Sequence, residues 1–174
     1  AGYILVAFAA QSALGTAAVL FYLASYALMK LGAFTVLSWL SGPGERHMEL
    51  DDYAGLASQR PVAAACFSLF LLSLLGLPVT AGFLGKFYIF DAALKSHLIW
   101  LTVLLALNTV IGAYYYLRVI VAMYMRPAKR SFTEGRVPAG IAAVLAIAAA
   151  GTIALGLFPN YFIEFAARAA TMLK

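Results

Sequence analysis

The sequence contains few charged residues. They make up 11% of its 174 residues, whereas a soluble domain averages about 25%. Apolar residues make up 64%, against about 45–50% in soluble domains. So few charges cannot cover the surface of a soluble globular domain, and a chain this apolar is not disordered. What remains is a multi-pass membrane protein, with room for about five spans because a spanning helix needs about 20 residues.

Residues that hold cofactors or perform covalent chemistry are also scarce. A single cysteine, Cys66, excludes a disulfide framework, an iron–sulfur cluster and a cysteine-rich zinc site. The two histidines, His47 and His97, lie beside polar or loop-like sequence, which argues against a haem held between two buried histidines. Phosphate-binding loops, nucleophile triads, metal-ligand pairs and dinucleotide-binding glycines are absent. We therefore expect no cofactor and no metal ion on this chain, and ion movement rather than redox chemistry.

The beginning of the sequence looks like the second half of a helix. It reads Ala-Gly-Tyr, without the charged and apolar regions of a signal peptide, and its first apolar run is too short to span a membrane. We interpret the chain as the C-terminal part of a longer membrane protein. Its net charge of +5 is concentrated in loops, which predicts contact with lipid headgroups rather than with nucleic acid.

The distribution of apolar residues predicts an all-α fold, a multi-pass transmembrane helix bundle with one interrupted helix. The spans are expected over residues 1–10 (truncated), 16–40, 61–94 (broken near 76–82), 98–124 and 137–158. Residues 50–57 fit either a short amphipathic helix on the membrane surface or a solvated loop. The tail, 161–174, predicts another amphipathic surface helix.

The third span is too long for one simple helix and contains helix-breaking residues in its middle: Gly76, Pro78 and Gly82. Proline removes a backbone donor, and glycine favours a bend. Non-helical backbone at membrane depth persists only where it is buried in protein or faces water. Gly85 and Lys86 follow the break at once, in a segment that is expected to be buried in protein or to face water.

The basic residues predict the orientation of the chain. With alternating spans, loops 45–60 and 125–136 share one side, and their six basic residues are Arg46, Arg60, Arg126, Lys129, Arg130 and Arg136. The three on the other side are Lys95, Arg168 and Lys174. The positive-inside rule places the first side in the cytoplasm, and therefore the C-terminus in the periplasm.

Lys86 is the strongest candidate for a functional residue. A charge deep in a bilayer costs at least about 2.5–3.5 kcal/mol, so it usually faces a bundle interior or a wet path. The break before Lys86 frees backbone carbonyls that can accept hydrogen bonds from the ammonium. A lysine in such a setting can take up and release a proton. The alternative is a lysine whose long stem carries the ammonium to the nearer interface.

Two other charges near apolar sequence have open roles. Lys30, in the middle of the second span, is a second possible relay site, a contact with a partner helix, or a side chain that reaches a local polar pocket. Asp91 and Lys95 lie four residues apart and would pair on one helical face. We expect a plain interfacial ion pair there, with Asp91 as a possible exit of a proton path as the alternative.

Several stretches resemble one known family. Residues 71–78 (LLSLLGLP) and 80–87 (TAGFLGKF) carry the resemblance, and 2–3, 26–29, 31–34, 51–56 and 114–118 support it. They are similar to the antiporter-like, proton-translocating membrane subunits of respiratory NADH:quinone oxidoreductase (complex I), which belong with the subunits of Mrp-type cation/proton antiporters. Within this family the string from Ala81 to Phe87 is typical of the N-type subunits. The resemblance covers nearly the whole chain, 1–174.

The resemblance implies a subunit of fourteen spans in two inverted repeats, of which this chain is about the last five spans. Lys86 would be the terminal lysine of the proton channel. The subunit would lie in the bacterial inner membrane, in a hetero-oligomer with the other membrane-arm subunits. NADH, FMN, iron–sulfur clusters and quinone would be bound by other subunits. A subunit of an Mrp-type antiporter and a purely structural membrane segment remain the alternatives.

Overall fold

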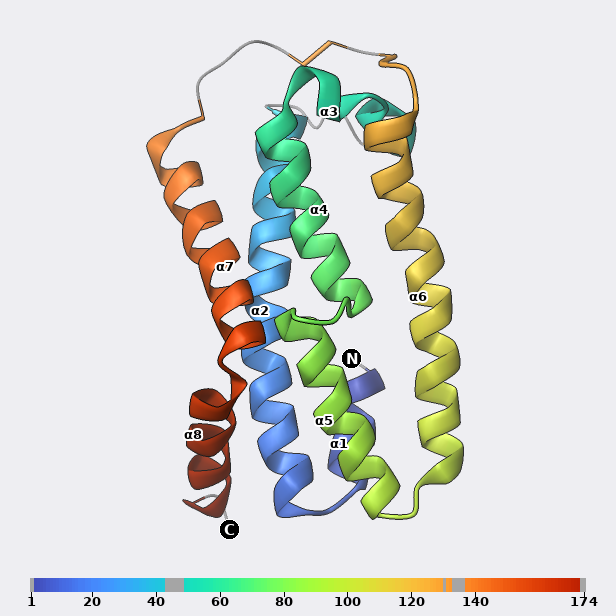
Figure 1. Ribbon diagram of the computed structural model, residues 1–174, viewed down its shortest axis with the longest axis vertical. Helices are drawn as coiled ribbons and strands as arrows, with labels where there is room; N and C mark the ends of the chain where they lie inside the picture. The colour runs from blue at the N-terminus through green and yellow to red at the C-terminus, as the bar shows by residue number, and fades with distance from the viewer. Residues whose placement is uncertain (1, 43–48, 130, 133–136, 173–174) are drawn as a thin grey trace.

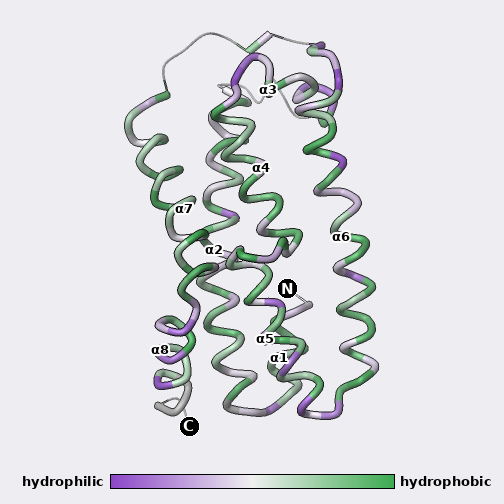
Figure 2. Tube along the Cα trace, viewed as in Figure 1, coloured by the Kyte–Doolittle hydropathy of each residue, from purple (hydrophilic) through white to green (hydrophobic). Residues whose placement is uncertain are grey.

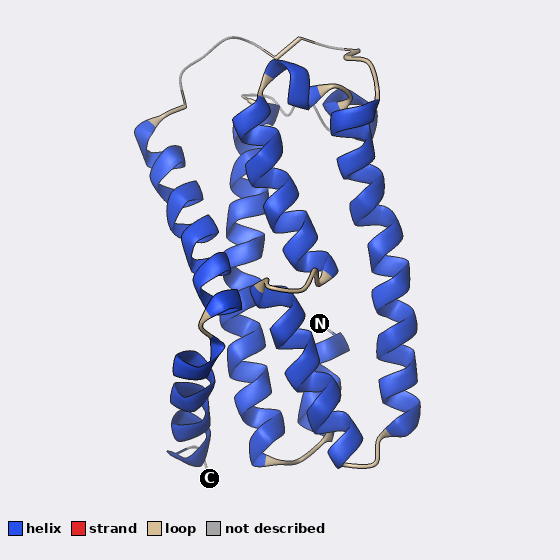
Figure 3. Ribbon diagram, in the orientation of Figure 1, coloured by secondary structure: helices blue, strands red, loops and turns tan. Residues whose placement is uncertain are grey.

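The computed structural model describes residues 2–42, 49–129, 131–132 and 137–172. Regular secondary structure in these ranges is helical throughout (Figure 3), which confirms the predicted all-α fold. In chain order the helices are α1 (Gly2–Ala9), α2 (Ala13–Ser41), the 3-10 helix η1 (Leu50–Tyr53), α3 (Leu56–Gln59), α4 (Pro61–Leu75), α5 (Ala81–Lys95), α6 (Ile99–Met125), α7 (Ala139–Leu157) and α8 (Pro159–Met172).

The helices form an elongated bundle (Figure 1). Helices α2, α6 and α7 are each long and apolar enough to cross a membrane. Helices α4 and α5 have 15 residues each and follow one another along the bundle, so together they extend over about the height of α6 (Figure 1). The predicted interrupted helix is therefore confirmed. Helix α1 packs beside α2 and α5.

Helix boundaries follow from local sequence. The Ser12 side chain accepts a hydrogen bond from the backbone N–H of Gly15 at 3.0 Å and so caps the start of α2. Gly42, at φ +64°, ends the same helix in a conformation that suits glycine. Pro61 stands in the first turn of α4, where its missing N–H leaves no helical bond unmade.

One end of the bundle is closed by η1 and α3, which together extend from Leu50 to Gln59 and so include the segment 50–57. The carboxylate of Asp51 pairs with Arg126 at 3.0 Å and with Lys129 at 2.5 Å. The hydrogen bond and the charge of Lys129 lower the pKa of the Asp51 carboxyl, and Arg126 adds to this effect. The backbone N–H of Gly55 also donates to the Ala122 carbonyl at 3.1 Å. These contacts hold the short helices against the end of α6.

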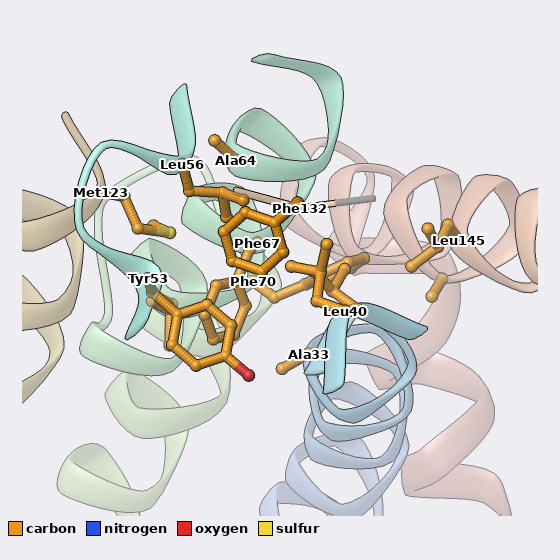
Figure 4. Packing of buried hydrophobic residues seen from close by; sticks show 13 residues of the cluster. Ala33, Leu40, Tyr53, Leu56, Ala64, Phe67, Phe70, Met123, Phe132 and Leu145 are labelled. Carbon is orange, nitrogen blue, oxygen red and sulfur yellow. The ribbon is translucent and has the colours of Figure 1, made fainter. Parts of the chain in front are cut away.

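We call the segment formed by η1 and α3 the cap. A hydrophobic core lies beneath the cap, between α2, α4, α6 and α7 (Figure 4). Phe70 and Val36 are fully buried in it, with Leu56 and Met123 contributed by the cap and by α6. A second cluster joins α1, α2 and α5 near the other end, and it includes Tyr3, Tyr22 and Ile89. Two packed clusters thus flank the break between α4 and α5.

The outer faces of α6 and α7 are apolar. Trp100 is 82% exposed, Val110 70% and Ile147 66%. Green, apolar positions run along these helices in Figure 2. Large apolar side chains on outward faces are typical of a helix bundle embedded in lipid or covered by neighbouring membrane helices.

The C-terminal helix differs from its predicted position. Helix α8 begins two residues before the expected tail and covers most of it, but it runs along the lower part of α2 in line with α7, rather than across the end of the bundle (Figure 1). Its buried residue Ala166 packs toward α2, where Leu20 and Ala24 line the same apolar pocket. The expectation of a surface helix was wrong because a face of small and aromatic residues packs equally well against a neighbouring helix.

The basic residues separate between the two ends of the bundle. Arg60 stands between α3 and α4, and Arg126 and Lys129 pair with Asp51 of η1, whereas Lys95 is the last residue of α5, whose end lies at the opposite end of the bundle (Figure 1). Arg46, His47, Arg130, Arg136 and Lys174 lie outside the described residues.

Candidate functional site

The break between α4 and α5 is a turn of five residues. Gly76 ends α4 at φ +97°, a conformation that favours glycine. The backbone N–H of Thr80 donates to the Leu77 carbonyl at 3.2 Å and closes a turn with Pro78 in its second position. Val79, in the third position, has φ +76°, which a β-branched residue rarely adopts. Helix α5 begins immediately afterwards, at Ala81.

The two half-helices approach each other closely at this turn. The backbone N–H of Gly82 donates to the Ser73 hydroxyl at 3.2 Å. A Cβ on Gly82 would overlap the Ser73 carbonyl oxygen, so glycine is required there. Gly85 has a similar role one turn later, because a Cβ would lie 3.0 Å from the ring of Tyr22. The glycines predicted at the break thus allow α5 to pack against α4 and α2.

Lys86 lies in the second turn of α5 and reaches back to the end of α4. Its ammonium donates to the carbonyl oxygens of Leu74 and Leu75, at 2.9 Å each. These carbonyls belong to the last turn of α4, where the break leaves them without helical partners. The ammonium also lies 5.3 Å from the centre of the Tyr3 ring. The predicted freed carbonyls are therefore present, and Lys86 contacts two of them.

A polar cavity of about 140 Å³ lies beside Lys86. Its wall includes Tyr3 and Tyr22 from α1 and α2, and Asn108 and Thr109 from α6. The hydroxyl groups of Tyr3 and Thr109 are hydrogen-bonded to each other. A polar cavity needs about 10–15 Å³ of such volume to hold one water, so this cavity has room for several. The arrangement supplies a lysine that can bind a proton and, next to it, a polar cavity large enough to admit water.

Lys30 does not join Lys86 at the break. Its ammonium lies 5.4 Å from the centre of the Tyr26 ring and 5.2 Å from that of Phe34, one turn away on either side. Tyr26 stacks on Tyr22 at 5.7 Å and lines the polar cavity, so the ring of Tyr26 lies between Lys30 and the cavity.

Asp91 also lies away from the break. It pairs with Lys95 at 2.8 Å, as the four-residue spacing predicts. Lys95 is largely exposed at the end of α5, so the geometry favours the plain ion pair over a buried path.

The sequence did not reveal the residues that complete the site. Tyr3, Tyr22 and Thr109 line the cavity, but their positions depend on how α1, α2 and α6 pack together. Asn108 and Thr109 are polar residues within an apolar helix, which is the one local signal for this wall. Among the described residues, no group of three histidine, cysteine or acidic side chains is arranged to hold a metal ion.

The fold and the site define an integral membrane helix bundle with a lysine at the break of an interrupted helix. The family model described as "NADH:quinone oxidoreductase/Mrp antiporter, TM" matches residues 1–112, and the chain belongs to this family. It is 54% identical over 175 residues to NADH-quinone oxidoreductase subunit N 1 of Solibacter usitatus, a match that covers 100% of this chain and 36% of the relative. The resemblance to N-type subunits is therefore confirmed.

Two solved structures share the fold. One chain of respiratory complex I from Thermus thermophilus is 31% identical, with a TM-score of 0.76 over 93% of this chain and 36% of that chain. A chain of the Mrp complex from a Dietzia species has a TM-score of 0.85 at 20% identity, over 98% of this chain and 40% of that chain, and this likeness shows the fold alone. The chain spans about a third of the length of the relatives it matches.

Proposed function

We propose that this chain is part of membrane subunit N of a proton-pumping NADH:quinone oxidoreductase and helps to move protons across the membrane. The observation that carries the proposal is Lys86 itself. Its ammonium is held by two carbonyls at a helix break, next to a polar cavity with room for water. The 54% sequence identity to NADH-quinone oxidoreductase subunit N 1 of Solibacter usitatus supports the assignment to subunit N.

In the proposed mechanism Lys86 is the proton relay. The protonated amine is stabilised by the carbonyls of Leu74 and Leu75, and the cavity offers a route for the proton once the amine releases it. Quinone reduction elsewhere in the complex would change the electrostatic potential at Lys86 and so shift the balance between the protonated and neutral forms of its amine. The chain contributes proton transfer, and the redox step takes place in other subunits.

Two further residues have proposed secondary roles. Lys30 is a second possible relay, separated from the cavity by the ring of Tyr26. The role of Asp91 is the ion pair with Lys95, and the exit of a proton path from Lys86 is the alternative. Neither residue contacts Lys86 through any hydrogen bond or ion pair of the described residues.

The proposed setting is the bacterial inner membrane, with the end carrying Arg60, Arg126 and Lys129 in the cytoplasm and the C-terminus in the periplasm. Other membrane-arm subunits and the surrounding lipid would be the partners. NADH, FMN, iron–sulfur clusters and quinone would bind to those other subunits rather than to this chain.

A native gel of the source membranes tests the assignment. The gel is stained for NADH dehydrogenase activity and probed with an antibody against the full-length subunit. Co-migration with the active band, together with NADH-driven acidification of membrane vesicles, is the expected result. Migration in a smaller assembly without NADH dehydrogenase activity would overturn it.

The second candidate is a subunit of an Mrp-type cation/proton antiporter, because the family model that matches residues 1–112 describes both kinds of protein. Such a subunit would exchange sodium for protons without NADH. A sodium gradient imposed on vesicles would then change their internal pH, and deletion of the subunit would abolish that change. Under the leading proposal the deletion leaves sodium-driven exchange unaltered and removes NADH-driven pumping.

A further inference from the structure

The end of α7 packs directly against the break between α4 and α5. Gly156, the second-last residue of α7, is buried with its backbone against Val79 and Thr80. A Cβ on Gly156 would overlap the Val79 carbonyl oxygen and lie 2.8 Å from the Cα of Thr80. Because these are backbone atoms, no side-chain rotation relieves the overlap. Only glycine allows α7 to lie this close to the turn.

The turn that Gly156 contacts is held in an unfavourable conformation. Val79 has φ +76°, and such a conformation persists in a β-branched residue only where its surroundings fix it. The Val79 side chain is 63% exposed, so its own packing does not supply that constraint. The backbone contact with Gly156 does supply a constraint from outside the turn.

The same turn contacts Lys86 at its other end. A Cβ on Gly76 would lie 3.4 Å from Cδ and 3.5 Å from Nζ of Lys86. The carbonyls that hold the ammonium belong to the two residues before Gly76. The Thr80 hydroxyl donates to the Leu77 carbonyl at 2.6 Å, and Pro78 fixes its own φ, so the turn is stiff. A displacement at Val79 and Thr80 is therefore transmitted toward Lys86.

We propose that Gly156 is a positioning residue for Lys86. By letting α7 lie against the backbone of Val79 and Thr80, it fixes the turn and thereby the carbonyl groups that hold the Lys86 ammonium. Helix α7 carries none of the candidate relay residues, yet it becomes part of the structure that supports proton transfer. The inference rests on the proposed relay function of Lys86.

The test is Gly156→Ala in the full-length subunit within the assembled complex. Gly140→Ala on the same helix is the matched control, because a Cβ on Gly140 meets nothing within 4 Å. Small displacements of a reacting group lower rates strongly, so we expect Gly156→Ala to lower NADH-driven proton pumping per assembled complex roughly two- to tenfold. Gly140→Ala should pump at the wild-type rate.

A double variant separates positioning from a general structural effect. In a Lys86→Met background the displaced carbonyls hold no ammonium, so Gly156→Ala should cause no further loss of pumping. If Gly156→Ala pumps like Gly140→Ala, or lowers pumping by the same factor with and without Lys86, the inference is wrong.

A second variant tests the same turn without added bulk. Thr80→Val removes the hydrogen bond from the Thr80 hydroxyl to the Leu77 carbonyl and keeps the backbone one. It should also lower pumping only when Lys86 is present. Wild-type pumping by this variant would contradict the inference, even where Gly156→Ala fails to assemble. If Lys86→Met itself pumps normally, the relay proposal fails. If Lys86→Met is impaired and the Gly156 and Thr80 variants are not, only the positioning role fails.

Discussion

The ammonium of Lys86 lies 2.9 Å from the carbonyl oxygen of Leu74, across the break between the two half-helices that carry them. A lysine near the end of a helix stabilises the last carbonyls of that helix. Here the lysine comes from the next helix, so one side chain both closes α4 and holds the proton that the proposed mechanism moves. The structure of the break and the function of the site are therefore linked through this contact.

Close approach of the two half-helices should make Gly82 intolerant of substitution. In Gly82→Ala the new Cβ would overlap the Ser73 carbonyl oxygen and force α5 away from α4. Overpacking and loss of the Gly82–Ser73 hydrogen bond together should cost about 2 kcal/mol or more. The amount of assembled complex on a native gel should fall. Gly112→Ala, whose Cβ would stay 3.4 Å from its nearest neighbour, should assemble normally, and equal assembly of both variants would contradict the account.

The positive φ of Val79 makes a different prediction. Glycine adopts φ +76° without steric cost, so Val79→Gly should relieve strain of roughly 1–3 kcal/mol, less about 0.5–1 kcal/mol for the added freedom of the unfolded chain. A net gain of about 1 kcal/mol should appear as a higher midpoint of thermal unfolding of the purified complex. Val79→Ala keeps the Cβ and should bring no such gain. A lower midpoint for the glycine variant would show that the turn is not strained.

The ion pairs of Asp51 predict that the stability of the cap depends on pH. Lys129 holds the pKa of this carboxyl below its ordinary value of 3.8, so the folded state binds the proton more weakly than the unfolded state. The stabilisation is fully present above pH 3.8 and is lost as the pH falls through the lowered pKa. Asp51→Asn should remove it at every pH.

Hydrogen exchange of residues 50–59, corrected for the intrinsic effect of pH, measures this cap. Exchange in the wild type should be slow at neutral pH and rise only in acid, whereas Asp51→Asn should exchange faster already at neutral pH. Asp91→Asn removes an ion pair at the other end of the bundle and serves as the control. No difference between the two variants would mean that the Asp51 pairs do not hold the cap.

Local sequence was sufficient to predict the break and its lysine. Gly76 and Pro78 change the backbone wherever they stand, and Lys86 is conspicuous within an apolar stretch. The contact between Gly156 and Val79 was not predictable in the same way. Helix α7 is apolar on all sides, so no periodicity indicates which of its faces meets which neighbour.

The contacts of the cavity wall and of helix α8 could not be predicted from local sequence either. Tyr3 and Thr109 are more than a hundred positions apart and meet only through the packing of α1 on α6. The amphipathic pattern of α8 was recognised, but the pattern alone does not distinguish a membrane surface from the side of α2. The roles of backbone-breaking residues and isolated charges could therefore be predicted from the sequence, whereas contacts between apolar helices could be identified only from the structure.

Replacement of Lys86 by arginine is the most direct test of the relay. A guanidinium can still donate to the carbonyls of Leu74 and Leu75, but it does not release its proton in a protein. The measurement is NADH-driven proton pumping by vesicles that contain equal amounts of assembled wild-type, Lys86→Arg or Lys86→Met complex. We predict normal assembly of Lys86→Arg and pumping at roughly half the wild-type rate or less, as for Lys86→Met, because a relay must exchange its proton. Wild-type pumping by Lys86→Arg would show that Lys86 needs only its charge, and that it is not a proton relay.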